Sequence, residues 1–332
     1  MKIVNVVLSG GVGSRLWPLS RKSKPKQYLP IFDQQSLFEK TVGRNRGICD
    51  QVMVVGGVDN YQLSRDILDK VGVSDYIELV EAAPRNTAAA IAFAAMAVSS
   101  DDVLLVTPSD HLIGKQEKYE ALLREAIGMA QSGALVTFGL IPSRPETGFG
   151  YIEYEGNEVL GFREKPDLAT AREFLDRGNF LWNSGMFCFT AGTYLDELKK
   201  YEPELFEKAK NAYQHADSGF LPLELSMEIP SISVDYAVME KSDKIKVVPS
   251  DFSWSDMGSF EALYEYFQPG TKERVGNNLV IGAGRKHVEF VGLEHVVLVE
   301  TADAILVLNK ESAQEVKKVY ERLEKESPDL LE

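Results

Sequence analysis

Short runs of apolar, β-branched residues alternate with helix-like segments through the first 140 residues, and this alternation restricts the fold more than any other feature. The predicted strands are Ile3–Leu8, Val52–Val55, Tyr76–Val80, Val103–Val106 and Leu135–Phe138. The helices predicted between them are Leu37–Arg46, Tyr61–Val71, Thr87–Val98 and Tyr119–Gln131. Because strands that alternate with helices form βαβ crossovers, the pattern predicts an α/β fold with a mostly parallel central sheet that helices cover on both faces.

The pattern changes after residue 148. Strands that alternate like half-exposed antiparallel ones are predicted at Tyr151–Tyr154 and Val159–Arg163, a further strand at Trp182–Phe189, and helices at Ala169–Arg177 and Leu195–Gln214. From about residue 275, three short strands precede a charged helix; these segments are Leu279–Ile281, Val296–Val299, Ala304–Leu308 and Ser312–Glu326. We therefore expect a large domain over residues 1–270 and a small β-rich C-terminal domain over 271–332 that ends in a helix.

The charge of the chain is unevenly distributed. The sequence holds 50 acidic and 36 basic side chains, for a formal net charge of -14, yet its first 32 residues contain no acid. Five basic residues lie between Arg15 and Lys26. This local positive segment predicts a site for a polyanionic ligand, whereas the acidic remainder argues against broad binding to nucleic acid or to a membrane surface.

Composition and length limit the class of protein further. A chain of 332 residues with 44% hydrophobic content is long enough to bury a full core. No apolar run approaches the roughly 18 residues that a membrane span requires, and the N-terminus lacks the features of a signal peptide. Cys49 and Cys188 stand in no metal-binding or disulfide spacing. We expect a soluble, cytoplasmic protein with two reduced cysteines.

A glycine-rich loop follows the first predicted strand. It runs Leu8-Ser9-Gly10-Gly11-Val12-Gly13-Ser14-Arg15. Glycines let the backbone turn at positive φ, so that successive N–H groups can point at phosphate oxygens. The loop matches neither common phosphate motif, because Leu16 stands where a dinucleotide fingerprint needs its third glycine and the P-loop Gly-Lys-Ser/Thr is missing. Ligands of such sheets bind beyond the carboxyl ends of the strands, so this loop and Ser109-Asp110 are expected at one edge.

The continuous segment LSGGVGSRLWPLSRKSKPKQYL closely resembles the signature of the sugar-phosphate nucleotidylyltransferases, and within them of the bacterial mannose-1-phosphate guanylyltransferases. Further segments agree in the order typical of that family: Pro84–Ala88, Pro108–His111, Glu146–Tyr151, Phe162–Pro166, Trp182–Phe187, Ser233–Glu240 and Trp254–Gly258. The resemblance covers about residues 1–270 and continues more weakly to the end. It implies a Rossmann-like nucleotidyltransferase fold and transfer of GMP from GTP to mannose 1-phosphate, which yields GDP-mannose and pyrophosphate.

The resemblance also implies roles for individual residues. Arg15, Lys26 and Lys165 are the candidates for charge stabilisation during the reaction. Nucleotide binding is expected from Leu8, Ser9, Gly10, Gly11, Gly13, Arg15, Lys26, Asn86, Thr87 and Ser109. Binding of the sugar phosphate is expected from Gly148, Glu164, Lys165 and Asn183. Taken locally, Asn86 and Thr87 fit helix capping equally well, and Gly148 and Asn183 could each simply shape a turn.

Two aspartates are candidates for a magnesium site. Asp110 follows a predicted buried strand, and Asp256 precedes Gly258 and a predicted helix. Either could be an ordinary turn or N-cap residue, but the metal-binding aspartates of the resembled family fall on these positions. Mg²⁺ is commonly held by one or two carboxylates while substrate phosphates and water complete its octahedron.

Other functions stay open at this level. A related enzyme could use another sugar 1-phosphate or another nucleotide, because the base and the sugar are implied by resemblance and not by residue chemistry. A non-catalytic subunit that senses nucleotide sugars is the alternative of a different class, although such a protein would be expected to lack Arg15, Lys26 or a metal carboxylate. The family further suggests a homodimer through the C-terminal segment.

Overall fold

The structure, a computed structural model, describes residues 1–332 and forms two compact units. Unit 1 consists of Met1–Gly10, Thr41–Ser109 and Ile113–Trp254. Unit 2 consists of Gly11–Lys40, Asp110–Leu112 and Ser255–Glu332. The predicted division of the chain at residue 270 therefore stays a prediction, since unit 2 also gathers two segments from the N-terminal part of the sequence.

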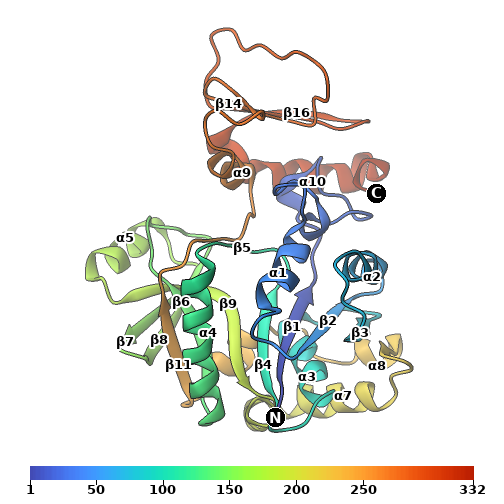
Figure 1. The fold of residues 1–332 in the computed structure, drawn as a ribbon, viewed down its shortest axis with the longest axis vertical. Coiled ribbons are helices and arrows are strands. Elements are labelled where there is room, and N and C mark those ends of the chain that lie inside the picture. The colour runs from blue at the N-terminus through green and yellow to red at the C-terminus, as the bar shows by residue number, and fades with distance from the viewer. The chain divides into compact units, whose positions relative to one another are not determined.

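Unit 1 is built on a ten-stranded sheet with the order β10-β3-β2-β1-β4-β9-β6-β11-β8-β7 (Figure 1). Its strands are β1 (Ile3–Ser9), β2 (Gln51–Gly57), β3 (Tyr76–Glu81), β4 (Val103–Pro108), β6 (Leu135–Leu140), β7 (Gly150–Glu155), β8 (Glu158–Glu164), β9 (Phe180–Thr190), β10 (Phe220–Leu221) and β11 (Ile245–Ser250). Its helices are α2 (Tyr61–Lys70), α3 (Asn86–Met96), α4 (Gln116–Gln131), α5 (Leu168–Arg177), α6 (Ala191–Tyr201), α7 (Pro203–Gln214) and α8 (Leu223–Met227). α1 (Leu37–Asn45) begins in unit 2 and ends in unit 1.

The expectation of a mostly parallel sheet is wrong for the sheet as a whole. The pairs β10–β3, β3–β2, β2–β1, β1–β4 and β6–β11 are parallel, and the alternation of strands and helices predicted this for β1, β2, β3 and β4. β9 then runs antiparallel between β4 and β6, and β8 and β7 continue antiparallel beyond β11. The sheet is mixed because its second half includes strands that are joined without a crossover helix, such as β7 and β8, which form an antiparallel hairpin.

Two of the predicted elements differ in detail. The single helix expected over Leu195–Gln214 is two helices, α6 and α7, which are separated at Glu202–Pro203 because proline lacks an N–H and disfavours helical geometry in the residue before it. The helix expected over Ser312–Glu326 begins as a 3-10 turn, Lys310–Glu315, and continues as α10 (Val316–Glu326). The other predicted strands and helices are present with shifted ends.

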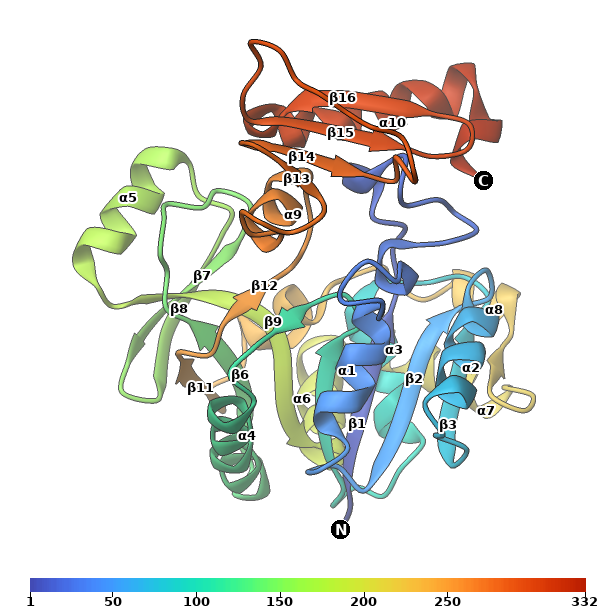
Figure 2. The ribbon, with the colours of Figure 1, turned by 45° about the horizontal axis from the view of Figure 1, so that its top comes forward.

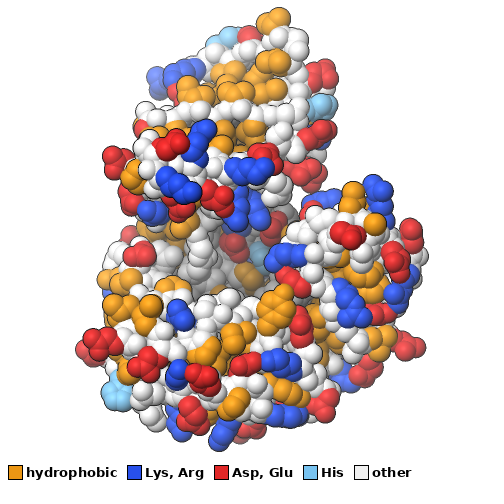
Figure 3. Space-filling view, turned by 180° about the vertical axis from the view of Figure 1, so that it is seen from behind, with side chains coloured by type: hydrophobic (Ala, Val, Ile, Leu, Met, Phe, Trp, Pro, Cys, Tyr) orange, Lys and Arg blue, Asp and Glu red, His pale blue; other side chains and the backbone are white.

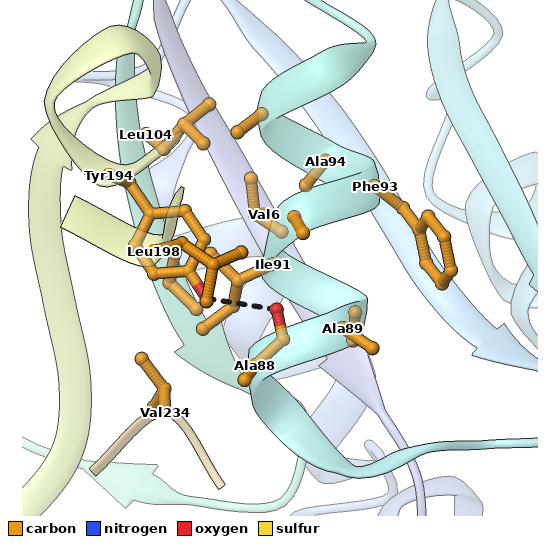
Figure 4. Close-up of a cluster of buried hydrophobic side chains, with 14 of the residues drawn as sticks. Val6, Ala88, Ala89, Ile91, Phe93, Ala94, Leu104, Tyr194, Leu198 and Val234 are labelled. Atoms are coloured by element: carbon orange, nitrogen blue, oxygen red, sulfur yellow. Dashed lines mark hydrogen bonds between the residues drawn. The ribbon is translucent and has the colours of Figure 1, made fainter. Parts of the chain in front are cut away.

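The alanine-rich helix α3 fills the core on one face of the sheet. Ala88 to Ala95 are all buried, and they pack with Val6 of β1, Leu104 of β4 and residues of α6 and α7 (Figure 4). The hydroxyl of Tyr194 donates a hydrogen bond to the carbonyl of Ala88 at 2.9 Å. On β4 the intervening Val103 and Leu105 enter a second core that includes α4, so the strand is buried on both faces. Small side chains let α3 approach the sheet closely, which fixes the position of its N-terminus.

Unit 2 contains a four-stranded sheet of order β13-β14-β15-β16 with α9 and α10 (Figure 2). The strands are β13 (Arg274–Val275), β14 (Asn278–Ile281), β15 (Val296–Glu300) and β16 (Ile305–Asn309), and α9 spans Phe260–Tyr266. A separate two-stranded sheet pairs β12 (Trp254–Ser255) with β5 (Leu112–Ile113). The inner face of the four-stranded sheet packs with Leu16, Trp17 and α10. None of the helices of the protein is both long and apolar enough to cross a membrane.

Candidate functional site

The glycine loop of unit 2 brings its backbone against Lys26. Gly11 and Gly13 have φ values of 81° and 77°, in the left-handed region that favours glycine. A Cβ atom on Gly13 would lie 2.5 Å from the Cβ of Lys26, and the N–H of Lys26 donates to the carbonyl of Val12 at 3.2 Å. Glycine is thus required at position 13 both by the backbone angle and by the space that the Lys26 stem occupies.

Lys26, Asp110 and Asp256 meet in one arrangement, which we call the lysine cluster. The Nζ atom of Lys26 lies 2.6 Å from Oδ2 of Asp110 and donates to the backbone carbonyl of Asp256, also at 2.6 Å. Lys26 is only 6% exposed, whereas the Asp110 side chain is 30% exposed. The fold thus joins three residues that lie up to 230 positions apart in the sequence.

The charges of the lysine cluster hold Asp110 ionised. Burial by itself would raise the pKa of Asp110, but the neighbouring Lys26 ammonium and His111 outweigh this effect, and the pKa is lowered below its ordinary value. Nε2 of His111 lies 3.7 Å from Oδ1 of the same carboxylate. Asp110 therefore remains an anion well into the acidic range.

Asp256 lies in a tight turn of the same unit. Its Oδ1 accepts a hydrogen bond from the N–H of Gly258 at 3.2 Å. A Cβ atom on Gly258 would lie 2.5 Å from Oδ2 of Asp256, so glycine leaves the space that the carboxylate occupies. The turn fixes the position of this carboxylate through a hydrogen bond from the backbone.

The basic residues near the glycine loop fall into different environments. Arg15 is exposed on the 3-10 turn Ser14–Leu16. Arg21 is only 8% exposed; it pairs with Asp303 at 2.7 Å and donates to the carbonyls of Pro18 and Leu330. Lys22 pairs with Glu332 at 2.9 Å. Arg21 is thus a structural anchor within unit 2.

In unit 1, the ends of two neighbouring strands come together as predicted. β1 and β4 are parallel, with Leu8 opposite Pro108, and the N–H of Ser109 donates to the carbonyl of Leu8 at 3.0 Å. Ser9 and Ser109 are buried, while Gly10 is exposed at the end of the strand. Leu8, Ser9, Gly10 and Ser109 therefore share one edge of the sheet.

The start of α3 carries the next pair of predicted residues. Asn86 is exposed, and its φ of 70° is unusual for a residue other than glycine. Its Oδ1 accepts a hydrogen bond from the N–H of Thr87 at 2.8 Å. The hydroxyl of Thr87 accepts from the N–H of Val234 at 2.8 Å. Thr87 thus ties the helix to the segment that precedes Asp235.

A second group of polar side chains comes from the end of β8, from β9 and from the turn Asp235–Met239. We call it the carboxylate cluster, and it consists of Glu164, Lys165, Asn183 and Asp235. Nζ of Lys165 lies 2.6 Å from Oε1 of Glu164, and Nδ2 of Asn183 donates to Oδ1 of Asp235 at 2.8 Å. Lys165 has a φ of 43°, a strained angle of the kind that gathers at functional sites. Burial is the main cause that raises the pKa of Asp235, and the neighbouring Glu164 carboxylate raises it further.

The two glycines near this cluster differ. Gly148 is exposed and its N–H donates to Oε1 of Glu146 at 3.0 Å. Gly150 pairs with Glu164 across the strands β7 and β8, and a Cβ atom on Gly150 would lie 2.7 Å from Oε2 of Glu164. The space beside the cluster therefore depends on Gly150, a residue that was not singled out from the sequence.

Two further carboxylates, the half-buried Asp235 and the buried Glu81, were not assigned a role from the sequence. Asp235 lies inside an apolar segment, and Glu81 is the last residue of β3, only 6% exposed, with an Oε1 atom that has no hydrogen-bond partner. Burial raises the pKa of Glu81 to about 7, although the backbone N–H of Arg85 lowers it in part. An acid directly after an apolar strand was the available signal for Glu81, and an acid within an apolar run was the signal for Asp235.

The two units thus each collect part of the predicted set. Unit 2 joins Gly13, Lys26, Asp110 and Asp256, with Gly11 and Arg15 in the same loop. Unit 1 brings Glu164 and Lys165 together in an ion pair and joins Asn183 to Asp235 by a hydrogen bond, and it aligns Leu8, Ser9, Gly10 and Ser109 at one edge of its sheet.

Two protein-family models match this chain. Residues 4–273 match the model of the nucleotidyl transferase family, and residues 276–323 match that of the MannoseP isomerase/GMP-like beta-helix domain. The mannose-1-phosphate guanylyltransferase of Klebsiella pneumoniae is 38% identical over 97% of this chain and 74% of its own length. The xanthan biosynthesis protein XanB of Xanthomonas campestris pv. campestris is 39% identical over 97% of this chain and 73% of its own length.

Solved structures are similar to this chain in both fold and sequence. A crystal structure from Thermus thermophilus, described as a mannose-1-phosphate geranyltransferase, has a TM-score of 0.83 and 32% identity over 98% of this chain and all of its own. A Helicobacter pylori structure described as a mannose-6-phosphate isomerase has a TM-score of 0.70 and 38% identity over 77% of this chain and all of its own. On this similarity of sequence and fold, the chain belongs to the mannose-1-phosphate guanylyltransferase family of nucleotidyltransferases.

Proposed function

We propose that this protein transfers GMP from GTP to mannose 1-phosphate and releases pyrophosphate. The observation that carries the proposal is the lysine cluster: a buried ammonium that contacts Asp110 and Asp256 and whose stem packs against Gly13 of the glycine loop. It occurs in a chain that is 38% identical to an enzyme named mannose-1-phosphate guanylyltransferase. The similarity supports GDP-mannose synthesis, and the cluster supports chemistry at phosphorus.

The reaction is an in-line displacement. A phosphate oxygen of mannose 1-phosphate forms a bond to the α-phosphorus of GTP, the bond between that phosphorus and the bridging oxygen to the β-phosphate breaks, and pyrophosphate leaves with the electron pair. Arg15 and Lys26 bind the triphosphate and stabilise the charge that grows on the leaving group. The guanidinium can engage two oxygens at once, whereas the ammonium acts as a point charge.

The donor set of the lysine cluster fits a magnesium ion. Asp110 and Asp256 offer hard carboxylate oxygens, Asp110 stays ionised, and the carboxylate of Asp110 and the backbone carbonyl of Asp256 both contact one cation, the Lys26 ammonium. Mg²⁺ typically takes one or two protein carboxylates and completes its shell with phosphate oxygens and water. When bound, the ion would neutralise phosphate charge and polarise the reacting phosphoryl group.

The remaining residues bind and orient the two substrates. For the nucleotide, these are Leu8, Ser9, Gly10, Gly11, Gly13 and Ser109 along the phosphates, with Asn86 and Thr87 near the base. For the sugar phosphate, Lys165 holds the phosphate, Gly148 and Glu164 contact the sugar, and Asn183 contributes to the same subsite. The exposure of Asn86, Lys165 and Gly148 supports these roles, because a ligand can reach them.

The test is pyrophosphate release over a grid of nucleoside triphosphates and sugar 1-phosphates. GTP with mannose 1-phosphate should give the highest kcat/KM. A clear preference for another pair would replace the assigned substrates, and the absence of turnover with every pair, together with nucleotide-sugar binding, would favour a sensing subunit.

Location and assembly complete the proposal: a cytoplasmic enzyme, divided at residue 270, that forms a homodimer through its C-terminal segment. Apolar side chains gather on part of the surface of unit 2 that Figure 3 shows. On the outer face of its sheet, Val280, Leu298 and Val307 lie side by side in register, and Val307 is exposed. Light scattering of the full chain tests the homodimer directly.

A further inference from the structure

Asp235 is the least expected member of the carboxylate cluster. It opens a π-helical turn, Asp235–Met239, a rare geometry that is frequent at functional sites. The preceding Val234 is buried in the core against α3 (Figure 4), and its N–H is bonded to Thr87. The carboxylate of Asp235 is therefore held in place by the core on one side and by Asn183 on the other.

Asn183 has little hydrogen-bonding capacity left for a ligand. Its Nδ2 donates to Asp235, and its Oδ1 accepts from the N–H of Gly185 at 3.2 Å, with the hydroxyl of Thr137 at 3.4 Å. A side-chain amide has two acceptor sites and two N–H donors, so only one donor remains. The amide is thus oriented by the protein, and what it orients is the carboxylate of Asp235.

The cluster has more carboxylates than cations. Lys165 pairs with Glu164, while Asp235 and Glu240 lie within electrostatic range of Glu164 and of each other. Burial is the main cause of the raised pKa of Asp235 and of Glu240, and the neighbouring carboxylates raise both further. Such a surplus of acceptors suits a ligand that brings several O–H donors, and sugar hydroxyl groups are donors of this kind.

The backbone of β7 comes close to the same cluster. Gly150 lies beside Glu164 and Asn183, and a Cβ atom there would lie 2.7 Å from Oε2 of Glu164 and 3.5 Å from Cβ of Asn183. An ionised carboxylate has about four acceptor sites, and Asn183 uses one of those on Asp235. Asp235 therefore keeps acceptor capacity for the hydroxyl of a ligand.

We propose that Asp235 accepts a hydrogen bond from a ring hydroxyl of the sugar 1-phosphate, and that Asn183 is a positioning residue that acts on the sugar through Asp235. The inference rests on the proposed function, since it needs a sugar phosphate as the acceptor substrate. It reverses the order of importance given by the sequence, in which Asn183 contacts the sugar and Asp235 has no role.

The experiment uses Asp235→Asn in the full chain, because this change removes the charge and keeps an oxygen for the Asn183 amide. The KM for mannose 1-phosphate should rise about 10- to 100-fold, the range for loss of a hydrogen bond to a charged group, while the KM for GTP stays within about twofold. Glu228→Gln, which removes an exposed carboxylate of unit 1 outside the cluster, is the control and should leave both constants near the wild-type values.

Deoxy analogues separate contact with the sugar from a structural role. Wild-type protein should discriminate against one of the 2-, 3-, 4- and 6-deoxy analogues of mannose 1-phosphate, and Asp235→Asn should lose that discrimination while keeping the others. Equal discrimination by both proteins against all four analogues, or an equal rise of both KM values, overturns the inference.

Two further results keep the test decisive. Asn183→Ala should show the same selective loss with a smaller rise in KM, and it serves if Asp235→Asn does not fold; a larger and non-selective loss in Asn183→Ala contradicts its positioning role. If wild-type protein releases no pyrophosphate from GTP and mannose 1-phosphate, the proposed function fails instead, and the series is repeated with the sugar phosphate that the protein does use.

Discussion

The lysine cluster of unit 2 and the carboxylate cluster of unit 1 shift the pKa of an aspartate in opposite directions. In the first, a nearly buried ammonium lies against Asp110, and the pKa of that aspartate is lowered. In the second, carboxylates outnumber the single Lys165, and the pKa of Asp235 is raised. Opposite shifts of two aspartates agree with the two roles proposed above: phosphate oxygens and a metal ion as ligands of the lysine cluster, and hydroxyl donors as ligands of the carboxylate cluster.

The largest expected effect comes from removing the cation of the lysine cluster. Lys26→Met should lower kcat about 10²- to 10³-fold, the usual range for loss of one preorganised charge-stabilising group. The measurement is steady-state pyrophosphate release. Lys24→Met, which removes an exposed lysine two residues away, is the control and should change kcat less than twofold. Equal losses in the two variants would mean that general attraction, and not the cluster, carries the effect of Lys26.

The shape of the lysine cluster can be tested without touching a charge. Gly13→Ala adds a methyl group where the Lys26 stem lies and places alanine at a φ of 77°. We expect a loss of about 1–3 kcal/mol in unfolding free energy, as for other strained backbone positions. Gly43→Ala, at a helical position with nothing within 4 Å of the added carbon, should be neutral or stabilising by up to about 1 kcal/mol. Similar denaturant midpoints for both variants would contradict the close packing of Gly13 on Lys26.

Glu81 extends the comparison to a buried carboxylate with no cation at all. Its folded pKa of about 7 lies above the ordinary value of 4.5, so the folded state binds the proton more tightly than the unfolded state. Its contribution to stability is present below about pH 4.5 and is lost as the pH rises to about 7. Glu81→Gln should therefore stabilise the protein at pH 8 by about 1–2 kcal/mol, the cost of an unpaired buried group, and have little effect near pH 4.5.

Denaturant unfolding at the two pH values checks this sign. Glu78→Gln on the same strand provides the contrast, because Glu78 is paired with Arg65 and that change should destabilise the protein. A Glu81→Gln variant that is less stable at pH 8 than the wild type would show that the carboxylate is compensated in the folded protein.

Much of the fold follows from local pattern, because each strand of the first half is apolar over its own length. The parallel strands around β1 and the shared edge of Leu8 and Ser109 were predictable for that reason. The antiparallel insertion of β9 between β4 and β6 was not, since strand order depends on long-range packing. The break at Pro203 was visible in the sequence as a proline, although the helical pattern continues on both sides of it.

The chemistry of the site was less predictable than the fold. Nothing local joins Lys26 to Asp110 and Asp256; the resemblance suggested these residues, and the structure adds the ion pair. Arg21 is a buried anchor whose partner, Asp303, lies 282 positions away in the sequence. The local sequence cannot indicate so distant a partner. Asp235 was missed because its importance depends on burial and on Asn183, and both arise only in the folded chain.

The central claim is that two aspartates of the lysine cluster support nucleotidyl transfer from GTP to mannose 1-phosphate. The most direct measurement compares pyrophosphate release by the wild-type protein and by a folded Asp110→Ala, Asp256→Ala double variant, with Mg²⁺ present and with unfolding curves recorded for both. The account predicts rapid release by the wild type and release near the background rate by the double variant. Release at the wild-type rate by a correctly folded double variant would contradict it.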